Sequence, residues 1–200
     1  MARYMRSRFF ERIRAMLSRI TKSLNVAVQV AILGFEKSYQ RGESIDSILG
    51  FVDVLTEIPN RRAFERDAGE IDGPYSLVLV DIDDFKNIND TRGHFFGDQV
   101  LKRLARILRE AVGEDGRVYR MAGDEFLLIV SVAKVSMICT TIRDNVRKED
   151  CFTVSQGVVP LTDRHITHQL ITQADWAMYQ SKAQGKDRIT FTAMELARAC

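Results

Sequence analysis

The sequence predicts one main domain of the α/β class, in which helices pack against a sheet. The 200 residues are 46% hydrophobic, which is enough for one full core, and the chain is too short for two ordinary domains. From residue 51 onward, apolar runs of strand length alternate with segments that repeat with a helical period. Glycine or proline separates several of these segments, and no internal repeat or low-complexity stretch interrupts them.

The first fifty residues show a different pattern and are predicted to form a separate N-terminal helix. Apolar side chains alternate at spacings of three and four, as in the seam of a coiled coil, at Phe10, Ile13, Leu17, Ile20, Leu24, Ala27 and Ala31. Seven basic side chains between residues 3 and 22 surround this seam. They form a solvated helix face, or else they contact an acidic partner or anionic lipid. The predicted domains are therefore residues 1–50 and 51–200.

The first elements of the main domain are predicted between residues 60 and 89. A helix is expected over 60–70, because Pro59 restricts its entry and Gly69 lies near its end. The apolar run at 75–81 is typical of a strand buried on both faces. Residues 85–89 are expected to form a short helix.

A glycine-hinged loop is predicted at residues 93–97, followed by a long helix. Asp98 stands where an N-cap is expected, ahead of a helix that extends to about residue 112. One face of that helix is apolar and the other is basic, so it should cover a sheet.

The remaining elements continue the alternation. We expect strands at 117–121 and 125–131, joined by a hairpin turn, then a helix at 133–147, a strand at 152–159, a helix at 166–184 and a last strand at 187–192. Trp176 and Tyr179, in the last helix, are expected to lie in the core.

Acidic side chains gather where two of these strands end. Asp81 and its neighbours at 83 and 84 come after a buried apolar run, and Asp124 and Glu125 come after the small pair at the hairpin turn. Adjacent carboxylates repel one another unless a cation holds them. Together the two groups would suit a hard divalent cation, which is what two-metal phosphoryl transfer requires.

Composition excludes several classes of function. The net charge is 29 − 27 = +2, so no overall field favours nucleic acid. Cys139, Cys151 and Cys200 are odd in number and lack metal-type spacing, which indicates reduced thiols in a cytoplasmic protein. The apolar run at 24–35 is shorter than the roughly 20 residues of a membrane span, and the N-terminus does not resemble a signal peptide. A soluble protein without a membrane span is expected.

Four motifs, in order, resemble those of the GGDEF family, the diguanylate cyclases. Residues 122–126 read AGDEF, with alanine in place of the first glycine of the signature. Residues 53–64 read DVLTEIPNRRAF and resemble the opening motif D-x-L-T-G-L-P-N-R-R-x-F. Residues 81–98 match D-[IV]-D-x-F-K-x-[IV]-N-D-x-x-G-H-x-x-G-D, and 174–182 match A-D-x-A-[LM]-Y-x-x-K. The resemblance covers about residues 51–191 and is highly specific, because all four motifs occur in the family's order.

The resemblance implies a fold, an activity and an assembly. The family's fold is a central, mostly antiparallel sheet flanked by helices, related to the palm of nucleotidyl cyclases and polymerases. The family joins two GTP molecules into cyclic di-GMP, and each 3′-hydroxyl attacks the α-phosphate of the other with loss of pyrophosphate. Each domain holds one GTP, so a homodimer is expected to act, with Mg²⁺ or Mn²⁺ as its metal. The first fifty residues are similar to the last helix of a sensor or to a signalling helix.

The resemblance also assigns the metal and catalytic residues. Asp81 and Asp124 match the side-chain ligands of the metal, and Ile82 matches a ligand through its backbone carbonyl. Glu125 resembles the family's second acidic signature residue, placed near the reacting hydroxyl or a second metal, and is the candidate base.

The same motifs assign the substrate residues. Asn89 and Asp98 match the pair that reads guanine, and Lys86 and Lys182 match positions that contact the β- and γ-phosphates. The full expected substrate-binding set is Phe85, Lys86, Asn89, Asp98, Lys182 and Lys186. Lys186 stands where the family commonly has arginine, and lysine loses the bidentate fork.

Other departures from the family pattern affect the loops and the sheet. Ala122 and Glu57 each replace a glycine, and Gln156 stands where an apolar residue is usual. The product-inhibition motif R-x-x-D would fall on residues 113–116, which read GEDG and contain neither its arginine nor its aspartate at the required positions. That regulatory site is therefore expected to be absent.

These residues support three functional hypotheses. The leading one is an active, metal-dependent diguanylate cyclase. The alternative is a catalytically weak GTP-binding module that regulates a partner, which Ala122, Glu57 and Lys186 leave open. A third is a mixed-dinucleotide synthase, which Asp98 disfavours because an aspartate acceptor would be left unpaired by adenine.

Overall fold

The computed structural model describes residues 50–71, 73–161 and 166–192. The chain divides into two compact units, Met1–Gly50 and Phe51–Cys200, and the described residues belong almost entirely to the second. The predicted heptad seam at 10–31 lies outside the described residues. Among the helices that the structure describes, none is both long enough and apolar enough to cross a membrane.

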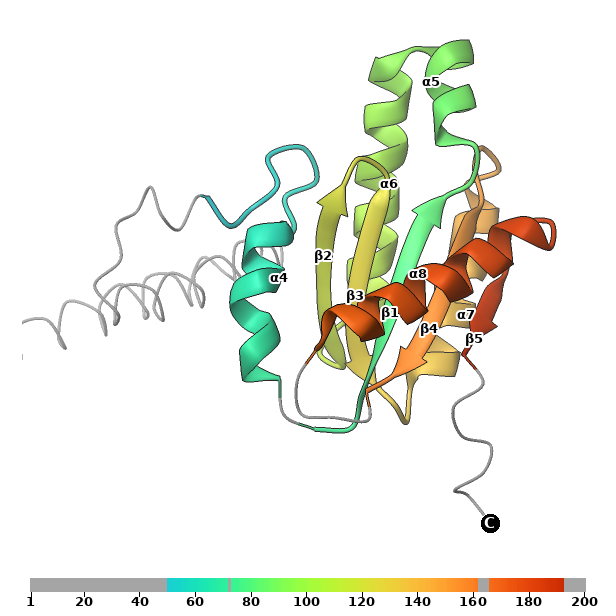
Figure 1. Cartoon of the computed structure of the whole chain (residues 1–200). Coiled ribbons are helices and arrows are strands. Elements are labelled where there is room, and N and C mark those ends of the chain that lie inside the picture. The colour runs from blue at the N-terminus through green and yellow to red at the C-terminus, as the bar shows by residue number, and fades with distance from the viewer. Residues whose placement is uncertain (1–49, 72, 162–165, 193–200) are drawn as a thin grey trace, which may run out of the picture. The chain divides into compact units, whose positions relative to one another are not determined.

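The second unit is built on one five-stranded sheet (Figure 1). The strands are β1 (Tyr75–Ile82), β2 (Gly116–Ala122), β3 (Glu125–Ser131), β4 (Val154–Pro160) and β5 (Ile189–Phe191). Their order is β2-β3-β1-β4-β5, and every pairing is antiparallel except that of β4 with β5. The prediction of a mostly antiparallel sheet is confirmed.

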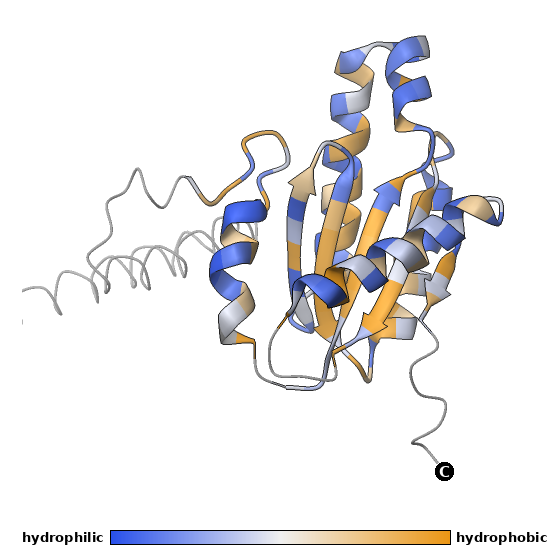
Figure 2. Ribbon diagram, in the orientation of Figure 1, coloured by the Kyte–Doolittle hydropathy of each residue, from blue (hydrophilic) through white to orange (hydrophobic). Residues whose placement is uncertain are grey.

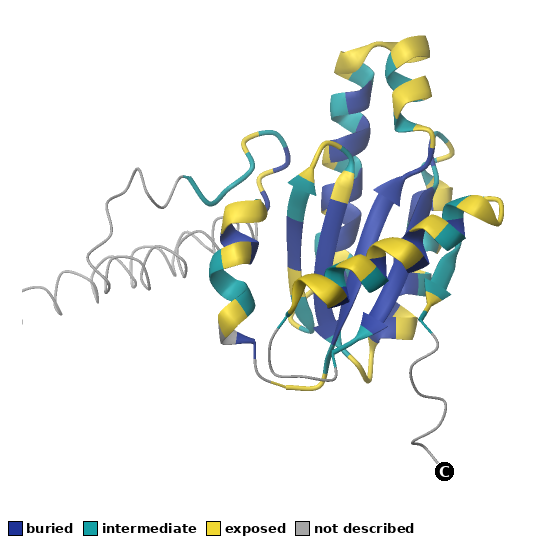
Figure 3. Ribbon diagram, viewed as in Figure 1, coloured by how far each residue is buried: buried dark blue, intermediate teal, exposed yellow. Residues whose placement is uncertain are grey.

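Helices cover both faces of the sheet and form two apolar layers. The helices are α4 (Arg61–Asp67), the short 3₁₀ turn η1 (Ala68–Glu70), α5 (Phe85–Arg92), α6 (His94–Val112), α7 (Val135–Lys148) and α8 (His168–Ala183). Helices α6 and α7 pack on one face, and α4 and α8 lie on the other. Apolar residues concentrate in the strands and polar ones on the outer helix faces (Figure 2), and the central strands are the most deeply buried elements (Figure 3).

Strand β1 is buried on both faces, as predicted. Val78 and Val80 belong to the layer under α6 and α7, whereas Leu77 and Leu79 belong to the layer under α4 and α8. Because side chains alternate along a strand, Asp81 must project to the same face as Leu77 and Leu79.

The predicted loop at 93–97 and the N-cap at Asp98 were both wrong. Helix α5 continues to Arg92 and α6 begins at His94, with Gly93 between them at φ 82°. Gly97 is buried inside α6, where an added Cβ would lie 3.0 Å from Asn89 Cγ and closer still to its Oδ1. The absence of a side chain at Gly97 leaves space for the side chains of Asn89 and Phe85 from α5, and Asp98 is an internal residue of α6.

Helix α8 packs closely on β4 through small residues. Ala174, Ala177 and Ser181 are fully buried. An added Cβ at Gly157 of β4 would lie 2.9 Å from Met178 Cα and closer still to the Ala174 oxygen and the Met178 nitrogen. The helix backbone therefore lies directly on the strand.

The large aromatic residues of α8 point away from the sheet, so their predicted place in the core was wrong. Trp176 is 57% exposed and Tyr179 is 63% exposed. The close contact with β4 leaves room beneath the helix for small side chains, and the aromatic rings are therefore on the outer face.

The structure shows the surroundings of Gln156 and the backbone conformation of Glu57, two residues that depart from the family pattern. Gln156 is fully buried and its Nε2 donates to the backbone oxygen of Cys139 in α7 at 3.0 Å, while its Oε1 has no partner among the described residues. Glu57 adopts φ 59°, a conformation that costs a residue with a Cβ about 1 kcal/mol relative to glycine. Both residues therefore reduce stability locally.

Candidate active site at one end of the sheet

Two acidic residues face each other across neighbouring strands at one end of the sheet. Asp81 of β1 pairs with Glu125 of β3 in the antiparallel register. Directly opposed residues project to the same face, with Cβ atoms about 5 Å apart, and like charges there destabilise the pair. The preceding pair on this face, Leu79 with Leu127, lies in the layer under α8. Both carboxylates are therefore on the α8 side of the sheet.

Asp124 lies beside this pair, in the turn between β2 and β3. Ala122 pairs with Glu125, so Gly123 and Asp124 form a two-residue connection, and Gly123 adopts φ 49°. The Asp124 carboxylate is close enough to act electrostatically on Asp81. The structure thus brings together the three predicted acidic residues of the site.

A cation from α8 partly compensates this negative charge. The Lys182 ammonium lies 2.7 Å from Asp81 Oδ1. Burial raises the pKa of Asp81 to about 6, and it does so despite Lys182, which lowers it; Asp124 and Glu125 raise it further. Asp81 is only 4% exposed, so a buried carboxylate is held here at a cost to the fold.

The donor set suits a hard divalent cation. In the parts of the chain that the structure describes, no group of three acidic, histidine or cysteine side chains converges as a ready metal site. Magnesium, however, is usually held by one or two carboxylates together with substrate phosphates and water. Asp81 and Asp124 would be the carboxylates of such a site, and Ile82, the expected backbone ligand, is the last residue of β1. These residues fit a metal that arrives with a nucleotide.

Asp83, just beyond the end of β1, has a structural role. It is 5% exposed, and its carboxylate accepts hydrogen bonds from Ser155 Oγ and Thr153 Oγ1, both at 2.6 Å, and from the backbone nitrogen of Asp187 at 3.0 Å. These bonds hold the segment after β1 against β4 and the segment before β5. Sequence reasoning missed the two hydroxyl residues, because they are separated from Asp83 by about seventy positions.

Lys186 pairs with Asp84 at the start of α5. Its Nζ lies 2.6 and 2.7 Å from the two Asp84 oxygens, and this hydrogen bonding raises the pKa of Lys186. Both residues have positive φ, 54° for Asp84 and 62° for Lys186. Lys186, an expected substrate-binding residue, is thus engaged by a neighbouring carboxylate in this structure.

The expected guanine-reading residues lie on the hairpin of α5 and α6, which projects beyond the end of the sheet (Figure 1). Asn89 of α5 packs against Gly97, the residue before Asp98 in α6, so the two expected residues lie on helices that are in contact. Phe85 packs between the helices, partly buried against the core beneath α6, and so supports the hairpin. Lys86 is exposed in the first turn of α5.

Sequence reasoning also missed Arg120, which holds the signature turn in place. Its guanidinium donates twice to the Gly123 oxygen, at 3.1 and 2.7 Å, and once to Asp53 Oδ1 at 2.8 Å. Asp53 also accepts from Thr56, and although burial opposes them, these hydrogen bonds lower the pKa of Asp53. The opening motif of the domain is thereby tied to the signature turn, a link that adjacency in the sequence does not reveal.

Because burial disfavours the charged form of Asp81, the free energy of unfolding should depend on pH. The pKa of Asp81 is higher in the folded chain than its ordinary 3.8, so the charged carboxylate opposes folding fully above about pH 6 and no longer does so near pH 4. Asp81→Asn should therefore be more stable than the wild type at pH 8, by roughly 1 to 3 kcal/mol. Urea unfolding in EDTA at pH 8 and pH 4 measures this. A variant less stable at pH 8 would contradict it.

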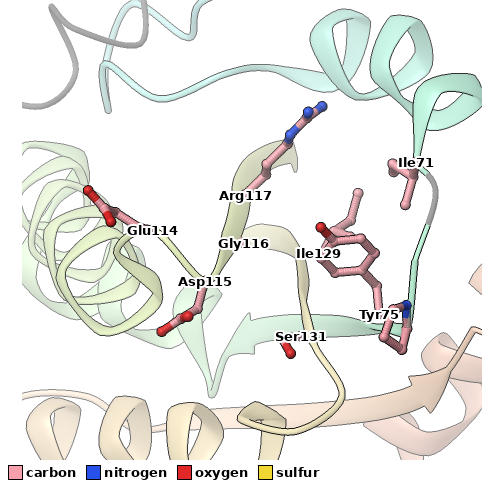
Figure 4. Close-up of a pocket in the computed structure, with 9 residues that line it drawn as sticks. Ile71, Tyr75, Glu114, Asp115, Gly116, Arg117, Ile129 and Ser131 are labelled. Atoms are coloured by element: carbon pink, nitrogen blue, oxygen red, sulfur yellow. The ribbon is translucent and has the colours of Figure 1, made fainter.

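A pocket of about 320 Å³ lies at the opposite end of these strands (Figure 4). It is lined by Tyr75 at the start of β1, Gly116 at the start of β2 and Ser131 at the end of β3. Of its charged lining residues, Arg117 forms an ion pair with Asp67 and Asp115 forms one with Lys134, while Glu114 is exposed. Because it lies at the other end of the strands, the pocket is separate from the acidic site.

Comparison with known proteins identifies relatives of the described unit. A family model described as "Diguanylate cyclase, GGDEF domain" matches residues 50–188. "Probable diguanylate cyclase DgcI" of Escherichia coli is 34% identical over 147 residues, which are 70% of this chain and 33% of that protein. The chain spans only about a third to a half of the length of curated relatives that it matches.

Solved structures give the same picture of the fold. The GGDEF domain of DgcB from Caulobacter crescentus, in complex with c-di-GMP, is 29% identical with a TM-score of 0.61, and the match covers 70% of this chain and 95% of that one. The coiled coil and GGDEF domain of DgcB, also with c-di-GMP, is 26% identical with a TM-score of 0.63 and coverages of 90% and 98%.

Proposed function

The chain belongs to the GGDEF family, and from this membership we propose that it condenses two molecules of GTP into cyclic di-GMP with release of two pyrophosphates. The observation that carries the proposal is the facing pair Asp81 and Glu125, with Asp124 beside them and Lys182 at 2.7 Å from Asp81. Three carboxylates at one end of the sheet are unfavourable for the fold, and in this proposal they serve a reaction that moves polyanions and protons.

We propose a separate chemical role for each group of site residues. A divalent cation, Mg²⁺ or Mn²⁺, bound by Asp81, Asp124 and the Ile82 carbonyl would neutralise charge on the phosphates. Glu125 accepts the proton of the attacking 3′-hydroxyl, because it is exposed at the start of β3 beside the metal ligands. Lys86 and Lys182 offset the charge that develops on pyrophosphate as it leaves.

Selectivity for guanine is proposed to arise on the hairpin of α5 and α6. The carboxylate of Asp98 can accept from guanine N1–H and the 2-amino group, whereas adenine offers neither in that place. Since Asp98 is an internal residue of α6, its side chain is not used to cap the helix. This disfavours a mixed-dinucleotide synthase.

A homodimer is proposed as the active form. The product is two-fold symmetric and each domain holds one GTP, so two sites must face each other in a C2-like encounter. The related DgcB structure, which includes a coiled coil, supports a role for the N-terminal segment in raising the effective concentration of the two sites.

The deciding experiment is a product assay with the full chain. The protein is incubated with GTP, ATP or both, plus Mg²⁺ or Mn²⁺, and the dinucleotides are identified by mass. We expect cyclic di-GMP and pyrophosphate from GTP alone. Tight GTP binding without any dinucleotide after hours would instead support the alternative, a catalytically weak GTP-binding module.

A further inference from the structure

Lys182 occupies a position that bears on how a metal and a nucleotide bind to the site. The Asp81 side chain is 6% exposed and the Lys182 side chain 35%, so the ion pair lies at the boundary between the core and solvent. The ammonium is beside one oxygen, Oδ1, of the carboxylate that a metal would use. A divalent cation and an ammonium cannot share that oxygen closely, because like charges repel strongly where water is scarce.

The backbone around Lys182 is fixed, so only its side chain can move. The preceding residue, Ser181, is fully buried, and its hydroxyl donates to the Gln156 oxygen at 2.8 Å and contacts Thr190 Oγ1 at 2.7 Å. The last turn of α8 is thereby tied to both β4 and β5. Lys182 can leave Asp81 by rotating its long side chain, without displacement of the helix.

We propose that Lys182 exchanges partners during binding: it neutralises Asp81 in the nucleotide-free chain and moves to the phosphates when metal and nucleotide arrive together. This inference rests on the proposed function, in which Lys182 is a phosphate ligand. A metal that bound alone would release Lys182 into water without a new partner. Metal and nucleotide should therefore bind with positive cooperativity, with Lys182 as the residue that couples them.

The exchange predicts that one substitution raises the affinity for metal alone and lowers the affinity for nucleotide. Lys182→Met keeps the length of the side chain and removes the ammonium, so Asp81 becomes available to a metal. Binding of Mn²⁺ without nucleotide should become tighter, by about 5- to 150-fold, the range typical of coupling between sites. In the presence of Mn²⁺, binding of a GTP analogue with a methylene bridge between its α- and β-phosphates should become weaker.

The test measures binding and not turnover. Free Mn²⁺ is monitored by electron paramagnetic resonance in titrations of the full chain, and the analogue by calorimetry. Lys182→Arg should behave like the wild type toward Mn²⁺ alone, since the positive charge remains. Lys134→Met is the matched control, because Lys134 forms an ion pair of the same kind with Asp115, 2.8 Å away, at the other end of the sheet.

Each outcome decides the proposal. Tighter Mn²⁺ binding by Lys182→Met, with wild-type values for Lys182→Arg and Lys134→Met, supports the exchange. Equal Mn²⁺ affinities for the wild type and a folded Lys182→Met overturn it, as does the absence of Mn²⁺ binding in both proteins. The product assay reports separately on the proposed function, because a catalytically inactive chain can still show or lack the exchange.

Discussion

Replacing Glu125 with glutamine should reduce the formation of cyclic di-GMP by at least about 100-fold, the usual contribution of a positioned general base. Glutamine keeps the size of the side chain and cannot accept the proton of the 3′-hydroxyl. Asp124→Ala should be as damaging, because it removes a carboxylate from the expected metal site. Mass-resolved product assays at saturating GTP and Mg²⁺ give the measurement.

The stability of the Glu125 variant separates lost chemistry from lost folding. Glu125 faces Asp81 directly and raises its pKa, so removal of this charge should leave the free energy of unfolding unchanged or increase it. Glu114→Gln, which changes an exposed carboxylate near the remote pocket, is the matched control and should retain activity. A Glu125→Gln protein with nearly wild-type turnover would exclude Glu125 as the base.

Gly157→Ala should destabilise the domain by about 3 kcal/mol, at the upper end of the usual penalty for overpacking. The added methyl group meets backbone atoms of Ala174 and Met178, which cannot rotate away as a side chain would. Helix α8 would have to move off the sheet, and its buried small residues would lose their contacts. Urea unfolding monitored by circular dichroism measures the loss.

Gly69→Ala is the matched control for this change. An added Cβ at Gly69 meets nothing within 4 Å, and its φ is not positive, so the same substitution should be neutral or slightly stabilising there. If Gly157→Ala matched Gly69→Ala in stability, the close packing of α8 on β4 would not be present in solution.

The sequence predicted the sheet well, because buried strands carry apolar runs that a helix surface does not. The wrong predictions concerned the two glycines at 93 and 97 and the aromatic residues of α8. The spacing of Gly93 and Gly97 predicts a hinged loop, whereas one lies between two helices and the other permits their contact. The hydrophobicity of Trp176 predicts a place in the core, but a close helix–strand contact admits only small side chains.

The candidate site was predictable where it depended on motifs and unpredictable where it depended on tertiary contacts. Asp81 and Glu125 are motif residues, and the strand register places them face to face. Arg120, which bonds to both Gly123 and Asp53, joins parts of the chain that are 67 positions apart. Such a contact depends on how β2 is placed relative to the opening loop, and no local pattern encodes it.

The middle of β4 has a consequence for reading mutational screens. Three consecutive residues there contact three different parts of the domain: Ser155 bonds to Asp83, Gln156 to the backbone of α7, and Gly157 lies directly beneath α8. In a survey of all single substitutions scored by cellular output, this tripeptide would stand out as intolerant although none of its residues has an assigned role in chemistry. Intolerance at these positions would then be mistaken for catalysis unless protein abundance were scored alongside it.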